Sequence, residues 1–493
     1  MSNPTVGIIG SGISGICAAI QVKEKLGITA KIFEAASEMG GTWSQNTYPG
    51  CACDIDSHIY SYSFALNPMW TQKYSGGSEI KEYVQGVAKK FGVYDDIQYN
   101  TTVISATWSE ELRQWKLDWI QNNQPIQTSY YDYLFSALGS LRIPRIPEIF
   151  KSFQGTIVHT GAWDSSIDFT DKKVAVIGSG SSAIQVIPHL VKSVASLESY
   201  QRSSAWVLDR NQFTFPSWVK TMFLYVPFIL YLYRFYSYLG WEYLYFLFGY
   251  PDSKASKFMT QSIKSRMIKR LEAKGRGDLV PLLIPDYVVG CKRVAPSENY
   301  LEALCDEKVY INRSPIREII GRTIVTEDGR SSEFDVLCLA TGFNVSGFLG
   351  NLRVTGRDNV CLNDLWSTEY SKTYKSVGIH GFPNFFLLGG PASLLGNNSV
   401  IFMFEQQVKL AVRSMAYAQK NNFIAMEPTV EAQDQFSDQL RRDFKGTSWE
   451  SGCNNWYKNE RGEISALWSG PSCAFFWKLH NTNFDKDYIH YSP

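Results

Sequence analysis

Two glycine-rich turns, each lying between an apolar run and a helical pattern, constrain the fold of this chain most strongly. In the first, "TVGIIGSGISGICAAIQV", an apolar run leads into Gly10, Gly12 and Gly15, and a helical pattern follows. A strand, a G-x-G-x-x-G turn and a helix in this order are typical of a dinucleotide-binding unit. The glycines permit a tight turn, close approach of a pyrophosphate and close helix packing, and the helix N-terminus favours the phosphate charge.

The same pattern occurs a second time, in "KKVAVIGSGSSAIQVIPHL". Here Gly178 and Gly180 form the turn, Ser181 and Ser182 begin the helix, and Ala183 takes the third glycine position. A single turn of this kind is a weak signal. Two of them in the same strand–turn–helix context indicate two nucleotide-binding units.

The residues that follow the second strand of each unit differ in charge. Glu34 follows Gly10 at the same interval at which Arg202 follows Gly178. A carboxylate at this position accepts hydrogen bonds from the ribose hydroxyls of adenosine, whereas a guanidinium binds a 2′-phosphate in a bidentate manner. The first unit is therefore expected to bind a nucleotide with a free ribose, and the second to bind NADP.

A sequence pattern that occurs twice predicts how the two units are connected. "YDYLFSALG" (131–139) resembles "FDVLCLATG" (334–342), and each is an apolar strand that would close one unit, so the second unit lies inside the first. The predicted fold class is α/β, with two nested Rossmann-like dinucleotide-binding domains. The predicted bounds are 1–140 and 338–493 for the first domain, and 141–337 for the second, which includes a helical, aromatic-rich insertion at about 210–290.

Composition argues against several other classes of protein. A net charge of +1 and a charged fraction of 19% provide no electrostatic basis for binding nucleic acid. Nine cysteines in 493 residues are too few for a dense disulfide framework, and we expect a reducing, cytoplasmic environment. Six scattered histidines suggest no metal site.

One segment, residues 222–250, is dense in Leu, Phe and Tyr. Pro227, Arg234 and Glu242 interrupt it, whereas a spanning helix needs ~20 nearly uninterrupted apolar residues. A buried or lid-like helical insertion is the favoured interpretation. The alternative is a helix that lies in a membrane interface, which would make the protein membrane-associated.

Several motifs resemble those of the Baeyer–Villiger monooxygenases, flavin-dependent enzymes with two dinucleotide-binding domains. The family fingerprint F-x-G-x-x-x-H-x-x-x-W-[PD] is matched by Phe153, Gly155, His159, Trp163 and Asp164. A second pattern, G-G-x-W-x-x-x-x-[FY]-P-G-x-x-x-D, is matched from Gly40 to Asp54, and a third, D-x-x-x-x-A-T-G-[FY], from Asp335 to Phe343. The resemblance covers nearly the whole chain, and "YPGCACD" is most similar to fungal members of secondary metabolism.

The resemblance implies a chemistry. FAD would occupy the first unit and NADP the second, and NADPH would deliver hydride to the flavin. The reduced flavin would react with O2 to form a C4a-peroxyflavin, which attacks the carbonyl of a hydrophobic ketone. Migration of a carbon then yields an ester or lactone with one inserted oxygen atom. The cofactor supplies the difficult chemistry, and the protein supplies position and electrostatics.

The resemblance also implies residue roles. Arg293 is expected to stabilise the peroxide anion and the oxyanion that follows it, and Asp54 to hold its guanidinium in place. His159 and Trp163 are expected to pack in a hinge between the domains. The expected FAD contacts are Gly10, Gly12, Gly15, Glu34, Gly41, Thr42, Trp43, Asp54, Tyr60, Val103 and Asn398. The expected NADP contacts are Gly178, Gly180, Ser181, Ser182, Ala183, Arg202, Ser203, Lys292 and Arg293.

Three alternatives remain open from the sequence. A flavin monooxygenase of the same fold could instead hydroxylate, or oxidise nitrogen or sulfur. A disulfide reductase would need C-x-x-x-x-C near the flavin, which Cys51 and Cys53 do not provide. The aromatic segment also fits a non-enzymatic, membrane-bound flavoprotein. Bacterial family members often have Arg where this chain has Ala52, which puts the local nicotinamide contacts in question. The sequence does not identify the ketone or the oligomeric state.

Overall fold

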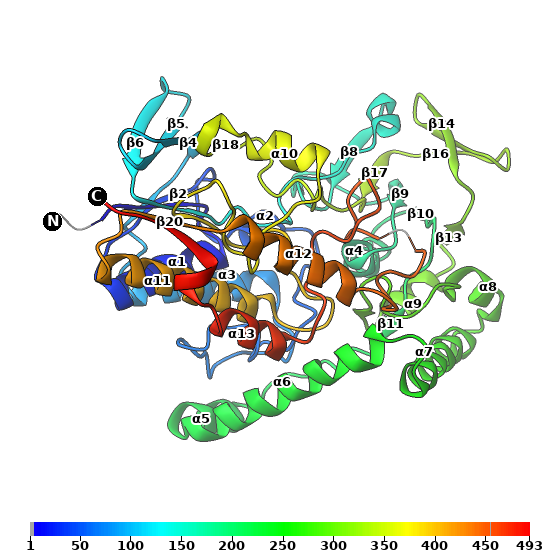
Figure 1. Ribbon diagram of the computed structural model, residues 1–493. Coiled ribbons are helices and arrows are strands. Elements are labelled where there is room, and N and C mark those ends of the chain that lie inside the picture. Colours follow the sequence, from blue (N-terminus) through cyan, green and yellow to red (C-terminus); the bar gives the residue numbers. More distant parts are fainter. Residues whose placement is uncertain (1–3, 454) are drawn as a thin grey trace.

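The computed structural model describes residues 4–453 and 455–493, and its centre is formed by two five-stranded parallel sheets (Figure 1). The first sheet has the strand order β19-β7-β1-β2-β3. Its strands are β1 (Val6–Ile9), β2 (Lys31–Phe33), β3 (Ile97–Gln98), β7 (Tyr133–Ser136) and β19 (Phe385–Leu387). The sheet is covered by α1 (Ile13–Leu26) and α11 (Val400–Lys420), whose buried side chains share one core. Strands covered on both faces are apolar throughout, which is why β1 and β7 are completely buried.

The second sheet has the order β13-β10-β9-β17-β8. Its strands are β8 (Thr156–His159), β9 (Lys173–Ile177), β10 (Ser196–Tyr200), β13 (Val309–Asn312) and β17 (Val336–Leu339). Helix α4 (Ser181–Leu190) follows β9 directly, as the second glycine-rich turn predicts. β17 pairs in parallel with β8 and β9 along its whole length.

The order of the strands along the chain confirms the nesting. Every strand of the second sheet lies between β7 and β19, which are neighbours in the first sheet. The chain therefore leaves the first unit after β7, builds the second unit and then returns. The predicted boundary between residues 337 and 338 falls within β17, so we place Leu339 with the second unit. The domain bounds themselves stay a prediction.

Smaller elements surround these two units. The mixed sheet β18-β4-β5-β6, in which β18 is parallel to β4 and the other pairs are antiparallel, extends from the first unit, and the antiparallel sheet β14-β15-β16 extends from the second (Figure 1). Their strands are β4 (Thr101–Ser109), β5 (Gln114–Gln121), β6 (Gln127–Tyr131), β18 (Arg353–Thr355), β14 (Ile316–Ile320), β15 (Thr323–Thr326) and β16 (Ser331–Glu333). The other elements are α2 (Thr42–Gln45), α3 (Gly77–Lys90), η1 (Glu148–Ser152), β11 (Val207–Leu208), β12 (Ala295–Pro296), α9 (Tyr300–Leu304), η3 (Arg357–Asn359), α10 (Leu362–Thr368), β20 (Ala425–Pro428), α12 (Val430–Asp443), α13 (Ser472–His480), α14 (Phe484–Asp487) and β21 (Tyr488–Tyr491).

The predicted insertion is helical. It contains α5 (Ser217–Tyr225), α6 (Pro227–Gly249), α7 (Lys254–Ala273), η2 (Gly277–Leu279) and α8 (Val280–Leu283). Figure 1 shows α5 and α6 as a long arm beneath the first unit. Pro227 begins α6, a position at which the missing N–H of proline costs the helix no hydrogen bond.

Among the described residues, no helix combines the length and the hydropathy that are needed to cross a membrane.

Candidate active site

The first glycine-rich turn has the geometry that a bound pyrophosphate requires. Gly10 has a φ of +106°, and a Cβ there would lie 2.5 Å from the carbonyl oxygen of Ala137. A Cβ on Gly15 would collide with the carbonyl of Gly10, so α1 can pack this closely only with glycine. Gly12 faces Gly41, whose own Cβ would lie 2.9 Å from the Gly12 Cα. Two backbone segments without side chains therefore meet in front of the helix N-terminus.

Glu34 lies next to this turn and is buried. Its carboxylate accepts hydrogen bonds from the backbone N–H of Ser11 (2.9 Å), the Ser11 hydroxyl (2.6 Å) and the backbone N–H of Ala36 (2.9 Å). The carboxylate is thus fixed at the end of β2. Val103, on β4, is buried in the core that contains Ile9, close to the same end of the sheet.

The segment after Gly41 adds aromatic side chains. Thr42 and Trp43 begin α2, and the Trp43 Nε1 donates to the Tyr60 hydroxyl at 3.2 Å. The two rings meet edge to face, with centroids 5.6 Å apart. Asn398 is buried two residues before α11, and its Nδ2 donates to the Glu242 carboxylate of α6 at 2.9 Å. The predicted FAD contacts thus all belong to the first unit.

The second turn repeats this geometry in the other unit. Gly178 has a φ of +123°, and a Cβ there would lie 2.4 Å from the carbonyl of Ala340. Gly180 has no heavy atom within 4 Å of its missing Cβ, so open space lies before α4. Ser181 and Ser182 begin α4, and Ala183 is buried, as expected for the position that packs the helix on the sheet.

Basic side chains gather beside the second turn. The Lys292 Nζ donates to the Ser203 hydroxyl at 2.5 Å. Burial, followed by the nearby charges of Arg202 and Arg313, lowers the pKa of Lys292. Arg202 is exposed, and the Arg313 Nη1 donates to the Ser204 hydroxyl at 2.9 Å. Like charges that lie this close are stabilised by a bound anion, and the phosphate of NADP is such a group. Arg313 was not predicted.

The predicted catalytic pair lies where the two units meet. The Arg293 Nε and Nη2 donate to the two carboxylate oxygens of Asp54 at 2.6 and 2.7 Å. About a fifth of each side chain is exposed, 20% for Arg293 and 21% for Asp54. Burial alone would raise the pKa of Asp54, but the charge and hydrogen bonds of Arg293 outweigh it and hold that pKa below its usual value. Asp54 is therefore ionised at neutral pH, and Arg293 carries its full charge.

A cavity of about 180 Å³ opens beside this pair. The insertion supplies much of its wall through Trp241, Leu244 and Phe248 of α6. Asn397 also lines the cavity, and its buried Oδ1 has no hydrogen-bond partner. The cavity thus combines apolar walls, a cation and a free hydrogen-bond acceptor, which is the pattern of a small-molecule site.

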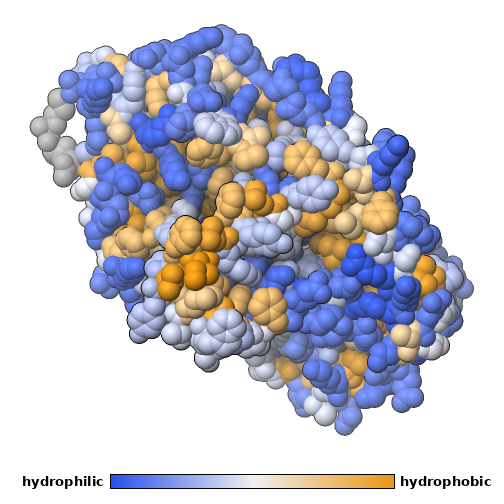
Figure 2. Space-filling view, turned by 90° about the horizontal axis from the view of Figure 1, so that it is seen from below, coloured by the Kyte–Doolittle hydropathy of each residue, from blue (hydrophilic) through white to orange (hydrophobic). Residues whose placement is uncertain are grey.

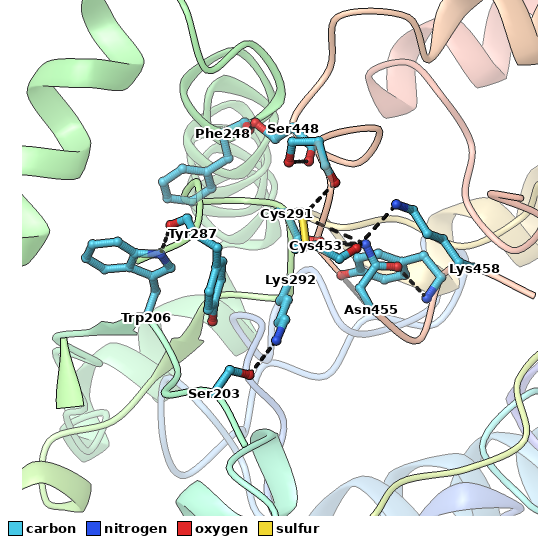
Figure 3. Close-up of a disulfide and its surroundings, with 12 residues drawn as sticks. Ser203, Trp206, Phe248, Tyr287, Cys291, Lys292, Ser448, Cys453, Asn455 and Lys458 are labelled. Atoms are coloured by element: carbon cyan, nitrogen blue, oxygen red, sulfur yellow. Dashed lines mark hydrogen bonds between the residues drawn. A yellow bond between two sulfur atoms is a disulfide. The ribbon is translucent and has the colours of Figure 1, made fainter. Parts of the chain in front are cut away.

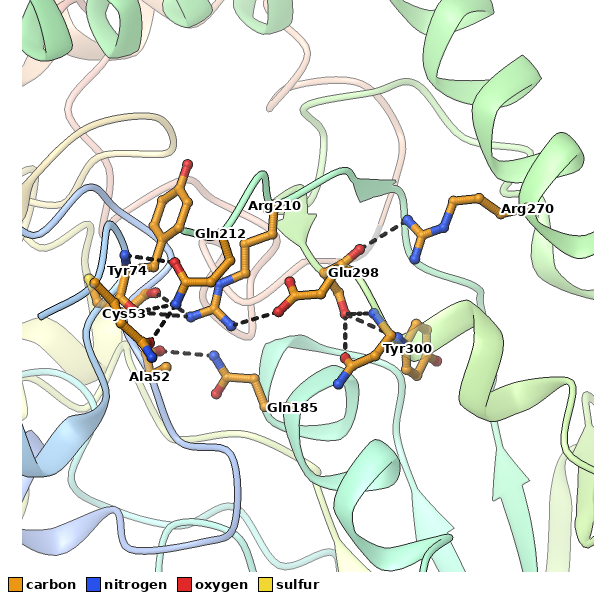
Figure 4. Close-up of polar contacts among 12 residues, drawn as sticks. Ala52, Cys53, Tyr74, Gln185, Arg210, Gln212, Arg270, Glu298 and Tyr300 are labelled. Carbon is orange, nitrogen blue, oxygen red and sulfur yellow. Dashed lines mark hydrogen bonds and ion pairs between the residues drawn. The ribbon is translucent and has the colours of Figure 1, made fainter. Parts of the chain in front are cut away.

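The segment around Ala52 contacts the second unit directly (Figure 4). The Gln185 Nε2 donates to the Ala52 carbonyl at 2.9 Å, and the Tyr48 hydroxyl donates to the Gln185 Oε1 at 2.6 Å. A Cβ on Gly50 would lie 2.6 Å from the Gln185 carbonyl. The tyrosine–proline–glycine loop is therefore pressed against α4. The Arg210 Nη2 of the insertion donates to the Cys53 carbonyl of the same segment at 3.4 Å (Figure 4), and its charge contributes to lowering the pKa of Asp54.

A disulfide connects the segment that carries Lys292 and Arg293 to the C-terminal part of the first unit (Figure 3). It links Cys291 and Cys453, whose Cα atoms are 6.4 Å apart. The Asn455 Nδ2 donates to the Cys291 carbonyl at 2.9 Å beside it. One bridge is not a dense framework, and the expected reducing environment stays a prediction.

His159 and Trp163 lie in and just after β8, on the edge of the second sheet. The His159 Nδ1 accepts a hydrogen bond from the Gly161 N–H at 2.9 Å, and its ring packs near Phe343. Its Nε2 is buried without a partner. Trp163 stacks on Phe169 with centroids 5.3 Å apart. These contacts lie within the second unit and the segment that leads out of it, so the hinge role stays a prediction.

Two nucleotide-binding turns in nested units, with an ion pair and a largely apolar cavity where the units meet, define a two-dinucleotide-domain oxidoreductase. Among the described residues, no group of His, Cys, Asp and Glu is arranged to hold a metal ion.

The chain belongs to the Baeyer–Villiger monooxygenase family. It is 32% identical over 493 residues to a Baeyer–Villiger monooxygenase of Pseudomonas aeruginosa, an alignment that covers 98% of this chain and 91% of that one. It is 34% identical over 478 residues to an FAD-binding monooxygenase, ktnD, of Aspergillus niger, with 94% and 78% covered. A family model described as flavin-binding monooxygenase-like matches residues 3–229. A solved steroid monooxygenase bound to NADP superimposes with a TM-score of 0.84 at 26% identity, with 99% and 100% covered.

These comparisons confirm the predicted family, the fold and the enzyme class, an NADPH-dependent flavin monooxygenase with FAD and NADP as cofactors. Sequence reasoning missed Asn397, Trp241, Arg210 and the bridged cysteines. Asn397 stood one residue from the predicted Asn398, and "LLGNNSVIF" could have indicated it. The other residues carry no local signal, because they reach the site only through long-range packing.

Proposed function

We propose that this enzyme inserts one oxygen atom of O2 next to the carbonyl of a hydrophobic ketone and so forms an ester or a lactone. The arrangement that carries the proposal is the Asp54–Arg293 pair at the wall of a largely apolar cavity between the two units. Apolar walls favour a hydrophobic substrate, and a fixed guanidinium favours a reaction in which negative charge develops on oxygen.

The residues of the first unit fit FAD. The space before Gly12 and Gly41 suits a pyrophosphate, because neither residue has a side chain there. Glu34 provides a carboxylate for the ribose hydroxyls, and Trp43 and Tyr60 provide an aromatic wall. We assign FAD binding to Gly10, Gly12, Gly15, Glu34, Gly41, Thr42, Trp43, Asp54, Tyr60, Val103 and Asn398.

The residues of the second unit fit NADP. The open space at Gly180 admits a pyrophosphate at the N-terminus of α4. Arg202 and Lys292 supply positive charge that matches a 2′-phosphate. We assign NADP binding to Gly178, Gly180, Ser181, Ser182, Ala183, Arg202, Ser203, Lys292 and Arg293.

FAD held by the first unit and reduced by NADPH would supply the activated oxygen that is transferred to the carbonyl group. Arg293 stabilises the negative charge on the transferred oxygen and on the carbonyl oxygen after attack, because its guanidinium stays protonated throughout. Asp54 holds the guanidinium plane with two parallel hydrogen bonds and stays ionised itself. Trp241 and Leu244 exclude water from the cavity and present an apolar surface to the ketone.

His159 and Trp163 position the second unit in this scheme. A buried imidazole whose pKa is lowered by burial stays neutral at physiological pH, so His159 holds backbone in place and does not carry a charge. Both side chains lie in the segment that leads into the second unit, where movement of that unit relative to the first would be transmitted.

Mass spectrometry of the products tests this function. The purified enzyme with NADPH and oxygen-18-labelled O2 is supplied with a panel of hydrophobic cyclic ketones and one thioether. One labelled oxygen in a lactone supports the proposal. Labelled sulfoxide without any lactone would instead assign the enzyme to sulfur oxidation.

A further inference from the structure

The outer face of the insertion carries a stripe of exposed apolar and aromatic side chains. On α6 it contains Phe228, Phe235, Tyr236, Leu239, Tyr243 and Phe246. Phe228 is 68% and Tyr236 is 78% exposed. The successive intervals are seven, one, three, four and three residues, which place all six side chains on one face of the helix, and the stripe is about 27 Å long at 1.5 Å per residue. Figure 2 shows hydrophobic side chains gathered on this face of the molecule.

The two charged residues of α6 point away from this stripe. The Arg234 guanidinium donates to the Ser61 hydroxyl at 2.8 Å and to the Ser61 carbonyl at 2.9 Å. The Glu242 carboxylate accepts from the Ser472 hydroxyl at 2.7 Å and from the Cys473 N–H at 2.8 Å. Both charges anchor α6 to the first unit. The charges that interrupt the sequence of this segment therefore leave its outer face uncharged.

An apolar groove accompanies the stripe. A cavity of about 530 Å³ lies between α5 and α6, and Phe223, Ile229 and Tyr233 form its inner wall. Leu232 and Tyr236 border it on the exposed side. The groove extends the apolar surface into the molecule. Flexible hydrocarbon chains can enter such a groove, whereas a typical protein interface has a polar rim around its apolar centre.

Basic residues adjoin the stripe where α6 passes into α7. Lys254 and Lys257 are exposed at the start of α7, and Phe258 beside them is 75% exposed. Further along the helix Lys264 and Lys269 are exposed as well. The exposed acidic residues of this segment are Asp252 and Glu272, so the excess is positive although the whole chain carries only +1. An uncharged aromatic stripe next to lysines matches a bilayer surface with negatively charged headgroups.

We propose that the outer face of α5 and α6 docks on an anionic lipid surface, with the lysines of α7 over the headgroups. Tyrosine and phenylalanine rings suit the boundary between headgroups and acyl chains, because each presents a large apolar body and tyrosine adds a polar tip. The opposite face of the same helix supplies Trp241 and Leu244 to the active-site cavity, so the docked helix lies between the lipid and that cavity. The docking does not rest on the proposed function, since no residue of the stripe lines the cavity.

Vesicle sedimentation of the purified, FAD-bound full chain tests the docking. The vesicles contain either phosphatidylcholine alone or phosphatidylcholine with phosphatidylserine at roughly three to one. We expect binding to the mixed vesicles, weaker binding to phosphatidylcholine alone, and a decrease with added salt. Leu239→Asp and Phe228→Asp should each lower the partition coefficient by about tenfold or more, because a charge replaces an exposed apolar group that the lipid buries on docking.

A matched control is available on another surface. Leu112, in the turn between β4 and β5, is 52% exposed, close to the 47% of Leu239. Leu112→Asp should leave vesicle binding unchanged. All three variants should keep the flavin absorbance and the unfolding midpoint of the parent, because the replaced side chains are exposed.

Two results would overturn the proposal. The first is that the parent binds mixed vesicles no more strongly than Leu239→Asp does. The second is a concentration-dependent dimer in analytical ultracentrifugation that Leu239→Asp abolishes, without vesicle binding by the parent, which would assign the stripe to a second copy of the chain. Lys254→Glu with Lys257→Glu should remove the preference for phosphatidylserine, and an unchanged preference would also contradict the proposed role of α7.

Discussion

Replacing Arg293 by glutamine should separate NADPH consumption from oxygen transfer. Neutral flavin and neutral ketone need no cation, whereas the oxygen that attacks and the adduct that follows carry negative charge. Removing one preorganised donor to such an anion typically lowers the rate 10²–10³-fold, or by ~2.7–4 kcal/mol. Two N–H groups hold the guanidinium on Asp54 at 2.6 and 2.7 Å, so its orientation is fixed before the negative charge develops. We therefore expect Arg293→Gln to lower the rate of oxygen transfer by a factor within that range.

The same substitution also affects folding, and the two effects must be separated. Without Arg293 the Asp54 carboxylate loses its partner, which costs 3–5 kcal/mol in fully buried pairs. With 20% and 21% of the two side chains exposed, we expect a smaller loss of about 2–3 kcal/mol in the free energy of unfolding. Burial then raises the pKa of Asp54, opposed only by a backbone hydrogen bond and the charge of Arg210. The loss of stability should shrink as the pH falls and the carboxylate becomes protonated.

Two further variants provide the separation. Asp54→Asn combined with Arg293→Gln removes the uncompensated charge, so it should recover most of the unfolding midpoint but none of the oxygen transfer. Arg270→Gln is the matched control, because Arg270 is 16% exposed and donates to the two oxygens of Glu302 at 2.9 and 2.7 Å. It should lose stability but keep the full yield of product.

The decisive measurement is the amount of ester or lactone formed for each NADPH consumed, together with the release of hydrogen peroxide. This ratio is insensitive to a slower hydride transfer, which the loss of a nearby cation can also cause. In Arg293→Gln the ratio should collapse and hydrogen peroxide should rise. A product yield for each NADPH equal to that of the parent would refute the role of Arg293 and leave a purely structural ion pair.

Four other substitutions address the remaining roles. Arg202→Ala should raise the KM for NADPH and leave that for NADH unchanged, and equal changes would contradict a contact with the 2′-phosphate. His159→Ala should lower kcat while the protein still binds FAD, so recovery of unfolded protein without flavin would make His159 a residue of the fold alone. Arg210→Met should move the acidic limb of the kcat/KM profile to higher pH, because its charge helps to keep Asp54 ionised, and an unmoved limb would speak against that contribution. Cys453→Ser should lower the stability by about 2–4 kcal/mol under non-reducing conditions, whereas melting curves that do not respond to reductant would show that the bridge contributes nothing.

Local spacing was enough to predict the two nucleotide units. The position of Gly12 between β1 and α1, and of Gly180 between β9 and α4, follows from steric rules that act over a few residues. The nesting could also be predicted, because the strand that closes each unit has its own sequence pattern. Both β7 and β17 take the places beside β1 and β9 that this pattern implies.

The composition of the cavity could not be predicted in the same way. Trp241 lies in a segment in which almost every residue is aromatic or aliphatic, and only the helix phase decides which side chains turn inward. That phase is set by Arg234 and Glu242, which bond to distant parts of the first unit. The Cys291–Cys453 bridge likewise depends on a separation of 162 residues that no local pattern encodes.

The proposed role of Arg293 depends on contacts that both units make around it. Asp54 follows the tyrosine–proline–glycine loop of the first unit, and Arg293 comes from the second. Gln185 fixes that loop on α4, while the bridge at Cys291 holds the segment before Arg293 against the C-terminal part of the first unit. The ion pair is therefore held from two sides, by a contact of each unit with the other. The proposed role of Arg293 in oxygen transfer requires this arrangement, in which the guanidinium is paired with Asp54 and lies at the wall of the cavity.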